Sequence, residues 1–290
     1  MRNVWLVARR ELQVGLTRTS YIVTTAIIAV LLVAGVLVLN HFFGQDTSGL
    51  SFGEEGTDPL GATGARYLIV MVMSAILLFA LIFTGSMLSS GVIEEKSSRV
   101  VELLLSSMRA SDLLAGKVLG IGIIGLIQML IYTLAVFIPA KAMGLFAGLG
   151  FSVGGVALEM LAWFLLGFAA LGTLWAALSS LVSRQEDAGG IVAPLVLLAM
   201  VPFYLEIYLV PTSPDGGWAT ALSMAPFTAP FVMPMRQVFV SVPAWQLVTA
   251  VALNLAVIPL VIFVAGRIYR RAVLQTGSRM KLRDALRTHD

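Results

Sequence analysis

The chain has no cysteine, only two histidines, and few charged residues for its 290-residue length. The absence of cysteine excludes disulfide bonds, thiol catalysis and cysteine-ligated metal sites. His41 and His289 lie far apart in the sequence, so we expect both to be solvated rather than to share a metal ion. Charged residues make up 12% of the chain and hydrophobic residues 58%. Soluble domains carry about 25% charged residues, so this composition argues against a soluble domain.

Motifs for catalysis are also missing where a membrane enzyme would need them. Gly116-Lys117 follows Leu113-Leu114-Ala115 and lacks the glycine-rich loop that cradles phosphates in nucleotide-binding proteins. The apolar runs contain no HExxH, no GxSxG and no paired aspartates. We therefore expect no catalytic residues, no metal and no cofactor in this chain, so that any ATP hydrolysis would take place in a separate subunit.

Six apolar runs are long enough to cross a bilayer, whose hydrocarbon core of about 30 Å needs about 20 helical residues. They are Tyr21–Leu39, Tyr67–Leu88, Val118–Ala140, Val156–Leu181, Ile191–Val210 and Leu247–Gly266. No cleavage site follows the first run, so we expect it to be a retained helix rather than a signal peptide. The sequence thus predicts an all-α polytopic membrane protein, with one six-helix transmembrane domain over residues 1–290.

The basic residues are distributed unevenly between the two sides of this arrangement. Of the 19 Lys and Arg residues, all but Arg66, Lys141 and Arg236 fall on one side. The positive-inside rule places that side in the cytoplasm. We therefore expect a multi-pass protein of the cell membrane with both termini cytoplasmic, and no nucleic-acid partner. Most of the cytoplasmic basic residues lie in an arm (1–18), a loop (90–116) and a tail (267–290).

The amino-terminal arm has the pattern of a helix that lies on the membrane surface. Its apolar residues can face lipid while its polar residues face water; these are Val4, Trp5, Ala8 and Leu12 on one side and Arg9, Arg10 and Gln13 on the other. Trp5, Arg9, Arg10 and Glu11 are its candidate functional residues. The alternative is a plain basic anchor that only fixes the topology.

A dense group of charges interrupts the apolar sequence between the second and third spans. Glu95 and Arg99 form an i, i+4 acid-to-base pair, and Arg99 and Glu102 an i, i+3 pair. Leucines follow at once, which predicts an amphipathic helix over Glu94–Leu105. Lipid alone can hold such a helix, or a cytoplasmic partner can dock on it. The candidate docking residues are Glu94, Glu95, Lys96, Arg99, Glu102 and Leu105.

Two polar residues within the spans are candidates for a substrate path. An ionisable group at membrane depth is a functional candidate by default, and Glu206 in the fifth span is such a group. Alternatively, its side chain reaches the outer headgroups. Gln128 in the third span can line the same path or form a hydrogen bond between helices. Because acids in the spans are so few, we favour an amphipathic substrate over a bare ion.

The segment between the fifth and sixth spans holds three prolines at four-residue spacing. Pro226, Pro230 and Pro234 would share one face of a helix but remove backbone donors. Either a short broken helix that dips into the outer leaflet or an irregular interfacial loop fits this pattern.

The charged segment also resembles a known family. Its sequence Glu94-Glu95-Lys96-Ser97-Ser98-Arg99-Val100-Val101-Glu102-Leu103-Leu104-Leu105-Ser106-Ser107, followed by Leu113-Leu114-Ala115-Gly116-Lys117-Val118-Leu119-Gly120, is similar to the cytoplasmic signature of type-2 ATP-binding-cassette (ABC) transporter permeases. The similarity is strongest to the subfamily that includes sodium-extrusion permeases. Relatives there often carry a large extracytoplasmic domain between the first two spans, where this chain has only Asn40–Arg66.

This resemblance implies a role and partners for the chain. It implies a permease subunit of an exporter that pairs with a second permease, identical or related, around a substrate path. ABC ATPase subunits, which bind ATP and Mg²⁺, would dock on the Glu94–Leu105 coupling helix and on the arm. The alternative is a membrane scaffold or regulator that couples to an ATPase but transports nothing.

Overall fold

The computed structural model describes residues 2–44, 61–98, 108–146 and 152–272, and every regular element in these ranges is a helix. The long helices are α2 (Thr19–Gly44), α3 (Gly61–Ser97), α5 (Ala110–Ala142), α6 (Val153–Ser179), α7 (Gly189–Tyr208) and α10 (Ala244–Ala272). The short ones are α1 (Arg2–Thr17), the 3-10 helix η1 (Gln185–Asp187), α8 (Gly217–Met224) and α9 (Ala229–Phe239). Six helices are long and apolar enough to cross a membrane, which confirms the predicted number of spans.

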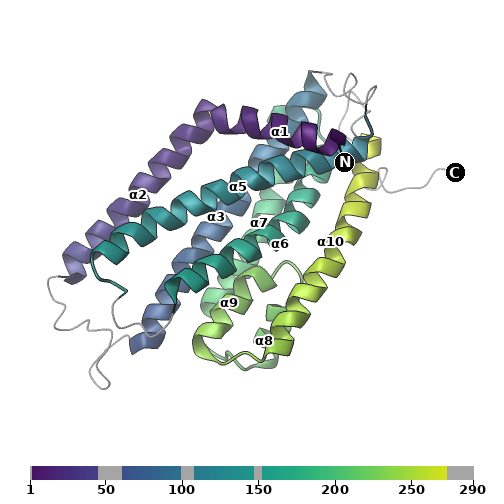
Figure 1. Ribbon diagram of the computed structural model, residues 1–290. Helices are drawn as coiled ribbons and strands as arrows, with labels where there is room; N and C mark the ends of the chain where they lie inside the picture. The colour runs from purple at the N-terminus through teal and green to yellow at the C-terminus, as the bar shows by residue number, and fades with distance from the viewer. Residues whose placement is uncertain (1, 45–60, 99–107, 147–151, 273–290) are drawn as a thin grey trace.

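The long helices form a bundle with different short helices at its two ends (Figure 1). Helix α1 lies across one end, and α8 and α9 lie at the opposite end. The most buried spans are α3, α5 and α6, whereas α2, α7 and α10 leave most of their surface exposed. A lipid-facing surface explains this exposure, because lipid tails solvate apolar side chains as well as a protein interior does.

Small residues let the three central helices approach each other closely. The indole of Trp175 in α6 covers the backbone of α3 at Gly85. A methyl group added at Gly125 of α5 would lie 2.5 Å from the Phe164 ring and 2.6 Å from Thr84. Such contacts replace the hydrophobic effect as the source of helix association in lipid. They fix α3, α5 and α6 as one packed unit.

Helix α1 packs against α5 rather than presenting its whole apolar side to lipid. Ala8 is fully buried, and its carbonyl oxygen would be 2.8 Å from a methyl group placed at Gly120. The prediction that Ala8 faces lipid is therefore wrong, because the missing side chain at Gly120 lets the α1 backbone contact α5. Trp5 is exposed, as a lipid-facing residue would be. The position of α1 at a membrane surface stays a prediction.

The proline-rich segment at the other end forms a helix rather than an irregular loop. Nearly all of α9 is buried, and it packs against α3, α6 and α7. Pro230 occupies its first turn, where a missing backbone donor is tolerated. Just before it, Phe227 has φ of 70°, a left-handed conformation that is rare for a bulky residue. Buried Arg236 then ties α9 to its surroundings by donating to the Pro214 carbonyl, to Ser223 and to Gln246.

Candidate functional site

A buried group of charges joins α1, α3 and α5 at the end of the bundle where α1 lies. Lys117 of α5 lies 3.1 Å from a carboxylate oxygen of Glu11 in α1 and 2.9 Å from one of Glu95 in α3. Arg10 of α1 reaches the other oxygen of Glu95 at 3.2 Å. Only 1% of the Lys117 side chain is exposed. We call Arg10, Glu11, Glu95 and Lys117 the ion cluster.

Burial sets the energetic weight of this cluster. Two charges taken out of water are stable only when partners and hydrogen bonds replace the lost hydration. Lys117 has two carboxylates within ion-pair distance, and it donates a hydrogen bond to Glu11. The cluster therefore holds the ends of three helices in one geometry, and removal of one partner leaves a buried charge uncompensated.

The same end of α3 is tied to α6. Lys96, also buried, donates to the backbone carbonyl oxygen of Ser180 at 2.6 Å. Ser180 is the residue at the carboxyl end of α6, where unpaired carbonyls give the helix a partial negative charge. Two turns earlier in α3, Ser89 accepts a hydrogen bond from Ser179 at 2.7 Å. The last turns of α3 therefore contact α1, α5 and α6 through polar side chains.

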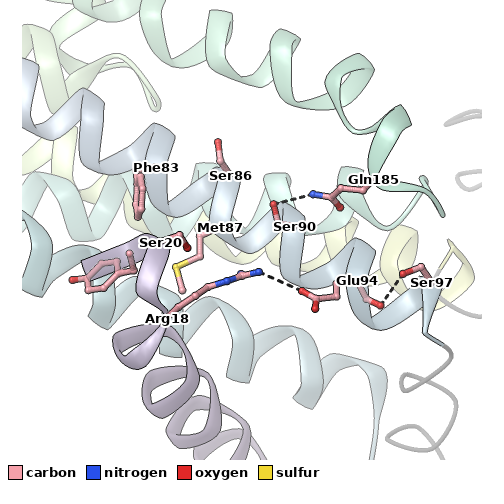
Figure 2. A pocket seen from close by; sticks show the side chains of 10 residues that line it. Arg18, Ser20, Phe83, Ser86, Met87, Ser90, Glu94, Ser97 and Gln185 are labelled. Carbon is pink, nitrogen blue, oxygen red and sulfur yellow. Dashed lines mark hydrogen bonds and ion pairs between the residues drawn. The ribbon is translucent and has the colours of Figure 1, made fainter. Parts of the chain in front are cut away.

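Beside these contacts lies a cavity of about 490 Å³, open on one side. Figure 2 shows its lining along one face of α3, with the start of α2 on one side and η1 on the other. Gln185 of η1 donates to Ser90 at 3.2 Å, and Arg18 lies 3.6 Å from Glu94 across the cavity. Both members of the Arg18–Glu94 pair are exposed, whereas Lys117 and Glu95 of the ion cluster are buried.

Two polar residues in the spans lie apart from this end. Glu206 of α7 is fully buried, and one of its oxygens accepts a hydrogen bond from Ser74 of α3 at 3.1 Å. Its other oxygen has no partner among the described residues. Gln128 of α5, also fully buried, donates to the hydroxyl of Tyr132 at 2.8 Å. Neither residue lines the cavity beside α3.

Comparison with known proteins identifies the family. The family model described as "ABC-2 family transporter protein" matches residues 55–267, well over half of the chain. The chain belongs to the ABC-2 transporter family. It is 31% identical over 283 residues to the uncharacterized protein YhaP of Bacillus subtilis (strain 168), and 27% identical over 233 residues to the uncharacterized protein MJ1024 of Methanocaldococcus jannaschii.

These two relatives are longer than the part they share with this chain. The match covers 93% of this chain and 65% of YhaP, and 79% of this chain and 53% of MJ1024. The chain thus spans about two thirds of one relative and about half of the other. Family membership and the six apolar helices make it a multi-pass membrane protein of the ABC-2 transporter family.

In this ABC-2 protein, the predicted docking residues differ in exposure. Glu94 is exposed, but Glu95 and Lys96 are buried, so the charges do not form one solvent-facing surface. All three belong to the continuous helix α3, which runs past the predicted end of the second span at Leu88. Arg99, Glu102, Leu105 and the predicted Glu95–Arg99 pair lie outside the described residues. So does any coupling helix formed by residues 99–107.

The remaining predictions for this region have mixed outcomes. On the arm, Arg9 and Arg10 are both exposed, and Arg10 and Glu11 belong to the ion cluster. Gln128 does not form the expected bond between helices, because its amide reaches Tyr132 one turn along the same helix. Glu206 does not extend to the outer headgroups, because its side chain is buried against α3. A substrate path at either residue stays a prediction.

Sequence reasoning missed Lys117 as a member of the site. Its signal was its place directly before the third predicted span, which begins at Val118, because a charge at the edge of a span needs a partner. The spacing of Gly116 and Gly120 also marked the α5 face on which α1 packs, since methyl groups there would approach Val7 and Ala8 within 3 Å. In a chain with 27 glycines, that spacing alone carried little weight.

The ion cluster is an element of structure that joins the arm to two of the spans. Among the described residues, no three His, Asp or Glu side chains gather to hold a metal ion. Because the ion cluster joins the arm to these spans, a displacement of one reaches the others.

Proposed function

We propose that this chain is the permease subunit of an ABC exporter. It forms a substrate path with a second permease, and separate ATPase subunits that bind ATP and Mg²⁺ drive it from the cytoplasm. The end of the bundle that carries α1 and the ion cluster faces the cytoplasm, in agreement with the bias in basic residues. The ATPase docks at this end, on exposed Glu94, on the exposed side of the arm, and on the predicted coupling residues Arg99, Glu102 and Leu105.

The ion cluster is the observation that carries this proposal. Lys117 joins Glu11 of the arm to Glu95 of α3 and is itself part of α5. A partner that displaces the arm or the end of α3 therefore moves all three helices. Charge pairs shielded from water resist separation more strongly than exposed pairs do. The cluster thus supports a role in coupling rather than in docking.

The substrate that we propose is amphipathic. Glu206 and Glu159 are the only acids deep in the described spans, and each already accepts a hydrogen bond, from Ser74 and from Trp163 respectively. A path for a bare cation should present more intramembrane acids. We retain the sodium-extrusion subfamily as a resemblance of sequence, and we propose an amphipathic compound as the transported substrate.

Co-purification with a candidate ABC ATPase subunit tests the proposal. Glu94→Lys reverses an exposed charge at the docking end, and Lys141→Glu is the matched reversal at the opposite end. We expect Glu94→Lys to weaken the complex about tenfold, which corresponds to about 1.4 kcal/mol, and Lys141→Glu to leave it unchanged. Equal affinities for both variants would refute docking at this end.

The transport step needs a separate measurement. In proteoliposomes that contain the complex, an exporter moves an amphipathic dye at the expense of ATP. A scaffold or regulator would bind the ATPase and alter its rate without moving any dye. An intact complex with no movement of any amphipathic compound tested would therefore favour the scaffold.

A further inference from the structure

The cavity beside α3 has the size of a ligand site. Its volume of about 490 Å³ lies within the range of about 300–1,000 Å³ that is usual for small-molecule pockets. One wall is a single face of α3, and Figure 2 shows the lining side chains gathered along it. The cavity is open to its surroundings on one side. A molecule in the surrounding bilayer can therefore enter it from the side.

The chemical character of this face changes along α3. Phe83 and Met87 supply the apolar part, deeper in the second span. Ser86 and Ser90 supply hydroxyl groups at the middle of the lining. Glu94 and the facing Arg18 supply charge at the end of the helix. The lining therefore combines apolar, hydroxyl and charged side chains, with the charge nearest the end of α3, which matches a lipid whose headgroup lies at that end.

The charges at the mouth of the cavity have opposite signs and hold each other weakly. Arg18 and Glu94 are 3.6 Å apart and largely exposed. Exposed pairs of this kind contribute only about 0–1 kcal/mol, so a ligand with stronger partners can replace the pairing. Guanidinium groups bind phosphate through paired hydrogen bonds. The Glu94 carboxylate beside the Arg18 guanidinium favours a ligand that also carries an ammonium group.

We propose that this cavity binds the headgroup of a zwitterionic phospholipid with a primary amine, namely phosphatidylethanolamine. Arg18 binds the phosphate, and Glu94 binds the ammonium group. Ser86 and Ser90 contact the glycerol and ester oxygens, and the acyl chains leave past Phe83 and Met87. The site requires only that the chain lies in a bilayer. Its assignment to the cytoplasmic leaflet rests on the proposed function.

Native mass spectrometry of the full chain in detergent tests this site without any ATPase. The purified protein is titrated with short-chain phosphatidylethanolamine and, separately, with phosphatidylglycerol of the same acyl chains. We expect phosphatidylethanolamine to bind about tenfold more tightly, since one charge-assisted hydrogen bond is worth roughly that factor. Equal or tighter binding of phosphatidylglycerol would show an anion site at Arg18 alone and would overturn the proposal.

Two variants locate the bound lipid. Glu94→Gln keeps the shape of an exposed side chain and removes its charge, so it should abolish the preference for phosphatidylethanolamine. Ser90→Leu fills the middle of the cavity and should weaken the binding of both lipids about tenfold. The matched control is Ser111→Leu, at an exposed position outside the cavity. If either cavity variant binds lipid as the control does, the lipid is not in this cavity.

Discussion

Replacement of Lys117 by methionine tests whether the ion cluster holds α1, α3 and α5 together. Methionine is similar in length and apolar, so the change removes the charge and leaves little empty space. The variant loses the contacts to Glu11 at 3.1 Å and to Glu95 at 2.9 Å. Glu95 retains its ion pair with Arg10, whose guanidinium nitrogen lies 3.2 Å from a Glu95 oxygen. Two carboxylates that shared one lysine would then lie near each other without it.

The expected cost follows from burial. Loss of one partner from a buried ion pair costs about 3–5 kcal/mol. We expect about 3 kcal/mol, the lower end of that range, because Arg10 still neutralises Glu95. Arg18→Met removes an exposed pair that contributes about 0–1 kcal/mol, and it serves as the control. The two variants remove the same kind of charge at the same end of the bundle, so their difference isolates burial.

Thermal unfolding of the purified protein, followed by fluorescence-detected gel filtration, measures the difference. At about 2–4 °C per kcal/mol, Lys117→Met should lower the melting temperature by roughly 6–12 °C, and Arg18→Met by far less. Addition of Glu11→Gln to Lys117→Met should recover part of the loss, because it removes the carboxylate that the loss of Lys117 leaves without its ion-pair partner. If Lys117→Met unfolds at the same temperature as Arg18→Met, the cluster does not hold the three helices together.

Three further changes test other parts of the structure. Gly120→Ala places a methyl group 2.8 Å from a backbone carbonyl of α1. The change should destabilise the packing of the arm by about 1–3 kcal/mol, and faster proteolysis of the arm would reveal it. Glu206→Gln keeps an acceptor for Ser74, so stability should change by less than about 1 kcal/mol, while substrate-stimulated ATP hydrolysis should fall if the carboxylate lines the path. Cysteines at Ser89 and Ser179, the only two in the variant, should form a disulfide that leaves ATP hydrolysis unchanged, because α3 and α6 move as one unit.

The spans were predictable because their signal is local. A helix that crosses a bilayer must satisfy its own backbone, and lipid demands a long apolar run, so length and hydropathy together suffice. The helix ends were less predictable. Helix α3 continues through Glu94 and Lys96 because Lys117 and the Ser180 carbonyl satisfy the charges of its last turns. Composition alone places the end of the span where the charges begin.

The ion cluster was not predictable in the same way. Glu11 and Lys117 are distant in the sequence, and nothing in the pattern around either residue specifies the other. The side of α1 that carries Ala8 was assigned to lipid, because an apolar residue suits lipid and a protein neighbour equally well. Only the small residues on the opposing helix, such as Gly120, distinguish the two environments. Their significance depends on knowing which helices are adjacent.

The packing of the central helices indicates which spans can move. Motion of the first, second and fifth spans together would require α3 to separate from α5 and α6. Gly85 under Trp175 and the polar bonds of Lys96 and Ser89 oppose that separation. Helices α2 and α7 are less buried than the central helices. The cavity beside α3 is bordered by α2 and by η1, which leads into α7. We therefore expect ATP-driven motion to displace α2 and α7 against a rigid unit of α3, α5 and α6, with the ion cluster carrying the force from the arm into that unit.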